Sequence, residues 1–111
     1  MTKPLSPTLR ERNRYLVFAL ACESPQKQKE VAQSVYSAAT RLLGELGASK
    51  ASLHFIEWNE QKQRCILKCN HKSVPEARAA LTVLTEVAGK KAAARTLGLS
   101  GTLKKTREKW M

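Results

Sequence analysis

The run Tyr15–Ala21 (YLVFALA) constrains the fold more than any other stretch of the chain. Every residue in it is apolar or aromatic, so both faces of an extended chain would carry side chains that avoid water. A strand with two apolar faces is typical of the centre of a sheet that is covered on both sides. The sequence therefore predicts a central strand here.

A long helix is expected directly after this strand. Ser24 can cap it and Pro25 suits its first position, whereas Gly47 would stop it after about Leu46. Gly44 is a weak point of this helix, because glycine lowers helix stability. Apolar residues recur through the segment with helical spacing, and the stripe they form is predicted to be buried. The stripe consists of Val31, Val35, Ala38, Leu42 and Leu46.

A hairpin and a second helix are expected next. Two extended patterns, Ser52–Trp58 and Arg64–Asn70, flank a polar run that predicts the turn between them. Ser73 and Glu76 have the spacing of a capping box, so a helix should begin there and end at Gly89. Its predicted buried stripe consists of Val74, Ala77, Leu81, Leu84 and Ala88.

The order of the elements predicts the fold class. A fourth strand fits Ala92–Leu97 and a basic C-terminal helix fits residues 102–110, which completes the order βαββαβ. This is the split βαβ plan of ferredoxin-like and RNP-like α+β sandwiches. We expect a four-stranded antiparallel sheet with two helices on one face, plus the basic helix. A chain of 111 residues forms a single domain, here 15–111, preceded by a basic N-terminal arm, 1–14.

Positive charge is concentrated at the two ends of the chain. The formal net charge is +11, and the sequence contains no aspartate. Residues 1–15 hold four Lys or Arg against one Glu, and residues 90–111 hold seven against one. Scattered charge usually marks a solvated surface, whereas this segregation favours a polyanionic partner. We see neither a secretion signal nor an apolar run long enough to cross a membrane, so we expect a cytoplasmic protein.

The segment Leu97–Met111 is the strongest candidate site. Gly98 and Gly101 precede a helical pattern whose cations follow at once. Free backbone N–H groups at a helix start, together with cations, form a site for phosphate, and RNA is the polyanion that fits best. The cations are Lys104, Lys105, Arg107 and Lys109. A Gly-x-x-Gly loop alone is a weak motif, because loops that cap helices often share it, and an ordinary solvated basic surface is the alternative.

Other functions of this fold are less well supported. An RNA recognition motif stacks bases on aromatic residues of its two central strands. Here the third strand has no aromatic residue, and Tyr15 and Phe18 should point to opposite faces. An acyl-phosphate hydrolase needs a glycine-rich loop and an arginine after the first strand, and Cys22–Lys27 supplies neither. No loop is shaped for a small regulatory ligand, and no catalytic residue is expected.

The three cysteines are expected to be structural. Cys22, Cys65 and Cys69 lie in or beside apolar strand patterns, as buried reduced thiols of a cytosolic protein do. Cys65 and Cys69 are four apart with His71 nearby, which is not the spacing of a zinc finger. We therefore expect no metal on the protein.

Three blocks of the sequence form a recognisable set: PTLRERNRYLVFALA (Pro7–Ala21), ILKCNHKSVPEARAALTVL (Ile66–Leu84) and RTLGLSGTLKKTREKW (Arg95–Trp110). Together they resemble the family of archaeal ribonuclease P protein component 2, which also contains a small eukaryotic ribonuclease P and MRP subunit. The order and spacing of the blocks make the match specific, and the resemblance covers nearly the whole domain. The second block contains the step Asn70-His71-Lys72, to which no role is carried over.

The resemblance implies a non-catalytic protein subunit of ribonuclease P. In this family the RNA removes the 5′ leader from precursor tRNA, with magnesium held by the RNA and no cofactor on the protein. The chain would bind and stabilise that RNA together with the barrel-shaped protein component 3, as a heterotetramer, and would meet precursor tRNA indirectly. The RNA-contact candidates carried onto this sequence are Arg10, Arg12, Arg14, Arg95, Ser100, Gly101, Lys104, Lys105 and Arg107, and Lys109 joins them from the charge pattern. The alternative is a basic protein-interaction adaptor in an RNA-processing complex, without direct RNA contact.

Overall fold

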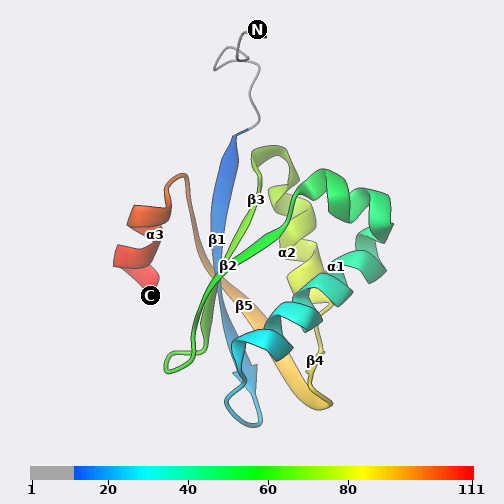
Figure 1. The fold of residues 1–111 in the computed structure, drawn as a ribbon, viewed down its shortest axis with the longest axis vertical. Helices are drawn as coiled ribbons and strands as arrows, with labels where there is room; N and C mark the ends of the chain where they lie inside the picture. Colours follow the sequence, from blue (N-terminus) through cyan, green and yellow to red (C-terminus); the bar gives the residue numbers. More distant parts are fainter. Residues whose placement is uncertain (1–11) are drawn as a thin grey trace, which may run out of the picture.

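The computed structural model describes residues 12–111, which form a curled antiparallel sheet with helices on both sides (Figure 1). The strands lie in the order β2-β3-β1-β5-β4. The elements, in chain order, are β1 (Asn13–Cys22), α1 (Gln28–Ala51), β2 (His54–Asn59), β3 (Arg64–Asn70), the 3-10 turn η1 (His71–Ser73), α2 (Val74–Thr82), β4 (Glu86–Val87), β5 (Lys90–Ser100) and α3 (Leu103–Trp110). The predicted α+β split βαβ plan and the basic C-terminal helix are confirmed.

The sheet has five strands rather than the predicted four. The additional strand, β4, pairs with the start of β5 through a turn at Ala88 and Gly89, whose φ angles are 52° and 79°. Positive φ at both central residues is the conformation of a tight two-residue hairpin turn. The second helix therefore ends at Thr82 and not at Gly89. Valine and threonine recur after Thr82, and such β-branched residues favour the extended chain over the helix.

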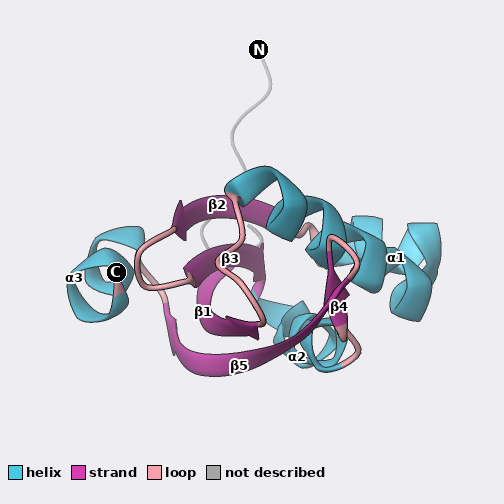
Figure 2. Ribbon diagram, turned by 90° about the horizontal axis from the view of Figure 1, so that it is seen from below, coloured by secondary structure: helices cyan, strands magenta, loops and turns pink. Residues whose placement is uncertain are grey.

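β1 is the central strand, as the apolar run predicted. It pairs with β3 on one side and β5 on the other, and Leu16, Val17 and Phe18 are fully buried. Alternation along the strand sends Leu16 and Phe18 into the main core beneath α1 and α2, which defines the α1/α2 face of the sheet. Val17 points to the opposite side with its β3 partner Ile66, which is also fully buried. We call that side the α3 face, because α3 covers it (Figure 2).

α1 is longer than predicted and is broken near its end. It runs from Gln28 to Ala51, but Gly44 has φ 75° and ψ 169°, which lies outside the helical region. The break changes which side of the turns after Gly44 faces the core, and Leu46 lies in those turns. Leu42 lies before the break, and there Leu43 packs against the core in its place. Val31, Val35 and Ala38 are buried as predicted, whereas Leu42 is 44% exposed and Leu46 73% exposed. The prediction that these two leucines extend the buried stripe was wrong.

The start of α1 is fixed by tertiary contacts rather than by the predicted cap. The helix begins at Gln28 and Ser24 does not cap it. Gln26 is buried instead, its backbone N–H donates to Gln63 Oε1 at 2.9 Å, and its carbonyl accepts from the Trp58 indole at 3.0 Å. These bonds tie the segment before α1 to the β2–β3 hairpin. α2 begins directly after Ser73, as predicted, but the Ser73 side chain makes no hydrogen bond to the helix. The hydrogen bonds of the predicted capping box were therefore wrong.

None of the helices in residues 12–111 combines the length and apolar character that a membrane crossing requires. α1, the longest, mixes charged and apolar residues throughout.

Candidate nucleic-acid interface

α3 is seated on the sheet by a contact between Trp110 and Gly98. Gly98 lies in β5 opposite Val17, so its missing side chain leaves a gap on the α3 face. The Trp110 ring fills that gap: a Cβ added to Gly98 would lie 2.6 Å from the ring atoms Cε2 and Cη2 and would overlap Cζ2. Such a separation is shorter than any real contact of this kind. Gly98 therefore makes room for Trp110, and the sequence-based idea that it admits phosphate is not needed to explain it.

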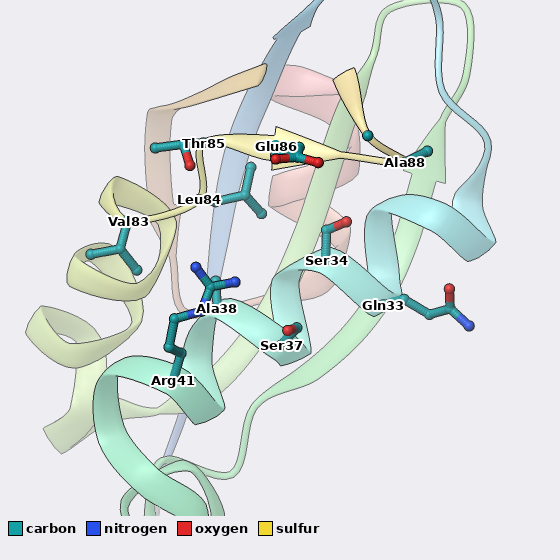
Figure 3. Close-up of a pocket in the computed structure, with 11 residues that line it drawn as sticks. Gln33, Ser34, Ser37, Ala38, Arg41, Val83, Leu84, Thr85, Glu86 and Ala88 are labelled. Carbon is teal, nitrogen blue, oxygen red and sulfur yellow. The ribbon is translucent and has the colours of Figure 1, made fainter. Parts of the chain in front are cut away.

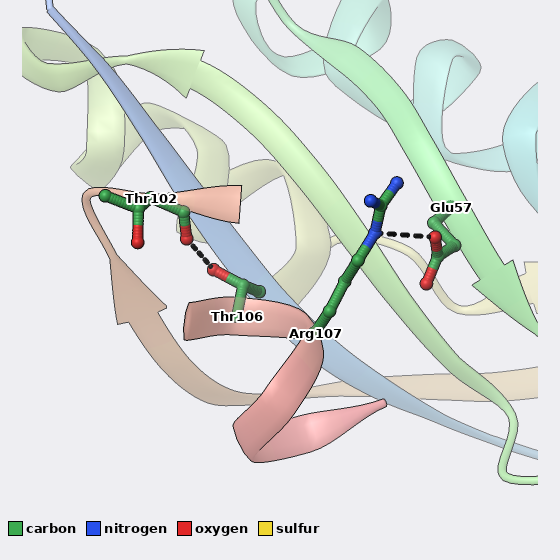
Figure 4. A network of polar contacts seen from close by, with 4 residues as sticks. All are labelled: Glu57, Thr102, Thr106 and Arg107. Atoms are coloured by element: carbon green, nitrogen blue, oxygen red, sulfur yellow. Dashed lines mark hydrogen bonds and ion pairs between the residues drawn. The ribbon is translucent and has the colours of Figure 1, made fainter. Parts of the chain in front are cut away.

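Polar contacts fix the orientation of α3 (Figure 4). The Thr102 hydroxyl caps the helix by accepting from the Lys105 N–H at 3.4 Å, and the fully buried Thr106 donates its hydroxyl to the Thr102 carbonyl at 2.7 Å. Arg107 extends across the sheet to Glu57 in β2, with Nε 3.0 Å from the carboxylate. The Arg64 guanidinium donates to the Trp110 carbonyl at 2.8 Å, where it complements the negative end of the helix dipole.

The cations that α3 does not use for packing face the solvent. Lys104 and Lys105 are exposed on its first turn. Lys109 is exposed as well and lies over the Trp110 ring, 4.9 Å from its centroid. Across the part of the chain that the structure describes, Arg107 makes the one ion pair. The positive charge of Lys104 and Lys105 is thus left without a carboxylate partner within residues 12–111.

Arg14 joins these lysines from the other end of the chain. Its guanidinium donates to the Asn13 carbonyl at 3.1 Å and lies 3.8 Å from the position that a Cβ on Gly101 would occupy. Gly101 follows Ser100, which pairs with Tyr15 at the start of β1. We call this site the basic corner, and it consists of Arg14, Ser100, Gly101, Lys104 and Lys105.

The backbone of the basic corner is partly occupied by its own bonds. Ser100 Oγ accepts from the Thr102 N–H at 3.3 Å and lies 3.2 Å from the Thr102 carbonyl, to which it can donate. The Lys105 N–H is bound to the Thr102 hydroxyl. The backbone N–H groups of Thr102 and Lys105, which lie where the sequence suggested donors for phosphate, are therefore bonded within the protein. The exposed lysines and Arg14 are the groups best placed to meet an anion.

Of the other predicted site residues, Arg95 lies apart from the basic corner. Arg10 lies outside the described residues. Arg12 precedes β1, and its backbone is tied to His71, which donates its N–H to the Arg12 carbonyl at 2.8 Å. Arg95 is exposed on the α3 face opposite Ala19, five positions along β5 from Ser100. Five residues of strand span about 16 Å, so Arg95 belongs to a different part of the same face.

The structure gives the step Asn70-His71-Lys72 a local role. Asn70 is buried, and its side-chain oxygen accepts from the Lys72 N–H at 3.0 Å, which caps the 3-10 turn. His71 holds the chain just before β1. This step shapes the strand-to-helix turn and brings exposed Lys72 near Arg12. The Arg64 contact at the end of α3 is a second feature that the sequence did not indicate, because nothing local to Arg64 points to residue 110.

Cys65, Cys69 and a polar cavity lie on the α1/α2 side of the sheet. Cys65 and Cys69 are fully buried in the main core. Burial raises the pKa of both thiols, and the Glu76 carboxylate raises that of Cys69 further, so both stay protonated and unreactive. A polar cavity of about 370 Å³ lies between α1 and the α2–β4 segment, where Arg41 and Glu86 line it (Figure 3). It is separated from the basic corner by the sheet.

Comparisons with known proteins agree with this architecture. A family model described as the Rpp14/Pop5 family matches residues 14–111. Relatives named ribonuclease P protein component 2 include one from Thermococcus gammatolerans, 44% identical over 98% of this chain and 91% of its own length. Another, from Methanosarcina acetivorans, is 40% identical over 98% of this chain and 81% of its own length. A chain in the cryo-EM structure of yeast ribonuclease MRP shares the fold, with a TM-score of 0.67 and 15% identity over 93% of each chain. With a family model that spans nearly all of its described residues and archaeal relatives at this level of identity, the chain belongs to the Rpp14/Pop5 family.

Proposed function

We propose that this chain, a ribonuclease P/MRP protein subunit by family, binds and stabilises the catalytic RNA of ribonuclease P for removal of the 5′ leader from precursor tRNA. It would act in the cytoplasm, and the magnesium needed for cleavage would lie on the RNA. The protein contributes fixed positive charge, which lowers the repulsion between RNA helices that must pack together.

The seating of α3 is the observation that carries this proposal. Trp110 against Gly98, buried Thr106 and the Arg107–Glu57 pair hold the helix, while Lys104 and Lys105 stay exposed and unpaired within residues 12–111. Cations on a rigid scaffold lose little freedom when they meet phosphate. Contacts of this kind position an RNA without reading its sequence.

We further propose that component 3 is the protein partner and that the pair doubles into a heterotetramer. The exposed Leu42 and Leu46 support a protein contact, because large apolar side chains gain from being covered. The centre of the α3 face, at Val17 and Ile66, is already covered by α3 (Figure 2). The partner surface is therefore better sought on α1 around its break at Gly44.

Cleavage of precursor tRNA tests the proposal directly. The cognate ribonuclease P RNA and component 3 are assayed at low magnesium with and without this chain. We expect cleavage to depend on the chain, and to lose that dependence as magnesium is raised. If the folded chain binds component 3 and leaves cleavage unchanged, the RNA role is overturned and the adaptor function replaces it.

A further inference from the structure

A row of polar and aromatic side chains crosses the α3 face beside α3. Tyr15 in β1 pairs with Ser100 in β5 on one side and with Lys68 in β3 on the other. Lys68 in turn pairs with His54 in β2. Residues directly opposite in neighbouring strands point to the same face and lie about 5 Å apart. We call Tyr15, Lys68 and His54 the Tyr15 row.

The Tyr15 row is accessible although the next rung of the sheet is not. Val17 and Ile66 make the neighbouring rung and are fully buried. Tyr15 and Lys68, by contrast, are half-buried, and His54 is exposed. α3 begins next to Ser100 at one end of the row, and its last residues contact Arg64, further along the sheet. The helix thus passes beside the row.

Lysines lie within the row and on the neighbouring helix α3. Lys68 lies within it, and Lys104 and Lys105 project from the first turn of α3. Arg107 extends across the same face to Glu57, which pairs with Ile66 on the neighbouring rung (Figure 4). An aromatic ring with a lysine directly opposite it suits a ligand that carries both a flat ring and a phosphate.

We propose that the Tyr15 row binds one unpaired nucleotide of an RNA, with the base on the Tyr15 ring and the phosphate at Lys68. The exposed imidazole of His54 provides a second flat surface at the outer end of the row. A base within a duplex cannot offer its face to a side chain, so the nucleotide must be unpaired. This inference rests on the proposed RNA-binding function and adds the class of RNA that this face selects.

The proposed site differs from the binding surface of an RNA recognition motif. Those domains use aromatic residues on both central strands. Here Phe18 is fully buried in the main core on the other face, as the alternation along β1 predicted, so Tyr15 is the aromatic that β1 offers to RNA. The second ring, His54, comes from β2 at the edge of the sheet. His54 lies two strands, about 10 Å, from Tyr15, so a single base stacks on one of the rings and not on both.

Binding of an unpaired and a paired RNA by the full chain tests the proposal. The probes are a fluorescein-labelled uridine decamer and an RNA duplex of the same length, at one salt concentration. Tyr15→Ala is expected to weaken decamer binding about tenfold, since the base loses the aromatic ring on which it stacks. Tyr15→Phe keeps the ring and should bind as the unchanged chain does. Duplex binding should change in neither variant.

A matched control separates the effect of losing Tyr15 from the effect of losing a tyrosine elsewhere in the chain. Tyr36 is 40% exposed on α1, on the other face of the sheet, and its hydroxyl accepts from the Phe55 N–H at 2.7 Å. Tyr36→Ala removes a tyrosine that touches β2 without facing the row, so it should leave decamer binding unchanged when the fold is retained in a thermal melt. If Tyr15→Ala fails to fold in a thermal melt, His54→Ala at the exposed end of the row is measured in its place. Ultraviolet crosslinking of the decamer should mark peptides that contain Tyr15, Lys68 or His54.

The outcomes distinguish this inference from the proposed function. If the chain binds ribonuclease P RNA but not the decamer, or if the row variants bind the decamer as tightly as the unchanged chain, the Tyr15 row is not a nucleotide site. The subunit role stands in either case. If the chain binds neither ribonuclease P RNA nor the decamer, the proposed function itself is overturned.

Discussion

The two faces of the sheet are covered in different ways. On the α1/α2 face, two helices cover a continuous core that extends from Leu16 and Phe18 to Val87 beside β5. On the α3 face, a helix of eight residues covers Val17 and Ile66 and rests on Gly98. One face holds most of the apolar contacts of the fold, and the other presents charge.

This difference suggests how one small domain combines stability with a surface for RNA binding. Burial of apolar side chains supplies most of the stability, so the α1/α2 face tolerates little change. The α3 face needs only enough packing to hold one helix in place, which leaves the outer side of that helix free for lysines. Substitutions on the α1/α2 face should therefore change stability more than RNA binding. Substitutions of the exposed lysines on the α3 face should change RNA binding more than stability.

Phe18→Ala should cause the largest loss of stability. Phe18 is fully buried in the centre of the main core, and truncation of such a residue costs about 3–5 kcal/mol of unfolding free energy. Unfolding in urea, followed by circular dichroism, measures the loss. Phe18→Leu, which retains most of the volume, should cost much less. A loss below about 1 kcal/mol for Phe18→Ala would contradict the assignment of this face as the main core.

Gly98→Ala should have an intermediate effect that is confined to the α3 face. The added methyl group overlaps the Trp110 ring, and overpacking of this kind costs about 1–3 kcal/mol. Tryptophan fluorescence should shift to longer wavelength as Trp110 becomes more exposed. In a Trp110→Ala background the same change should cost far less. Equal costs in both backgrounds would show that the glycine and the tryptophan do not meet.

Phe18 in β1 and Gly98 in β5 also show what the sequence can and cannot predict. Local pattern predicted β1 and the order of the elements, because an apolar run and helical spacing depend on near neighbours. The same local reasoning assigned Gly98 to a phosphate loop, because its contact with Trp110 forms only when α3 packs against β5. The stripe prediction failed at Leu42 and Leu46 for a related reason. The backbone break at Gly44 reset the side of the helix that faces the core at Leu46, and before the break Leu43 packs against the core where Leu42 was expected.

The candidate site shows the same contrast between what near neighbours predict and what distant contacts decide. Charge segregation identified Lys104 and Lys105 as exposed cations, and both are exposed. Their role in RNA binding stays a prediction. The sequence did not indicate that Arg107 is engaged with Glu57, because the two residues come together only when α3 crosses to β2. Nor did it show that Arg14 approaches Gly101, which requires the pairing of β1 with β5.

Glu57→Gln should have a small effect that depends on salt. Arg107 and Glu57 are 53% and 35% exposed, and exposed pairs contribute about 0.2–1 kcal/mol. A double-mutant cycle with Arg107→Gln isolates the coupling. We expect it to shrink as salt is added, because screening weakens interactions between exposed charges. A coupling that is larger and insensitive to salt would mean that the pair is more buried than the structure shows.

Replacing Lys104 and Lys105 together by alanine should change stability least and RNA binding most. Both side chains are exposed on α3 and alanine favours the helix, so the unfolding free energy should move by less than about 0.5 kcal/mol. If each lysine contacts one phosphate, the slope of log affinity against log salt should fall by about two. Lys29 and Lys50, exposed on α1, give a matched pair whose replacement by alanine should leave the slope unchanged. Equal slopes for the two double variants would mean that RNA responds to the total charge of the protein. Unequal slopes would place the contact on the α3 face, where packing holds the cations in position without neutralising them.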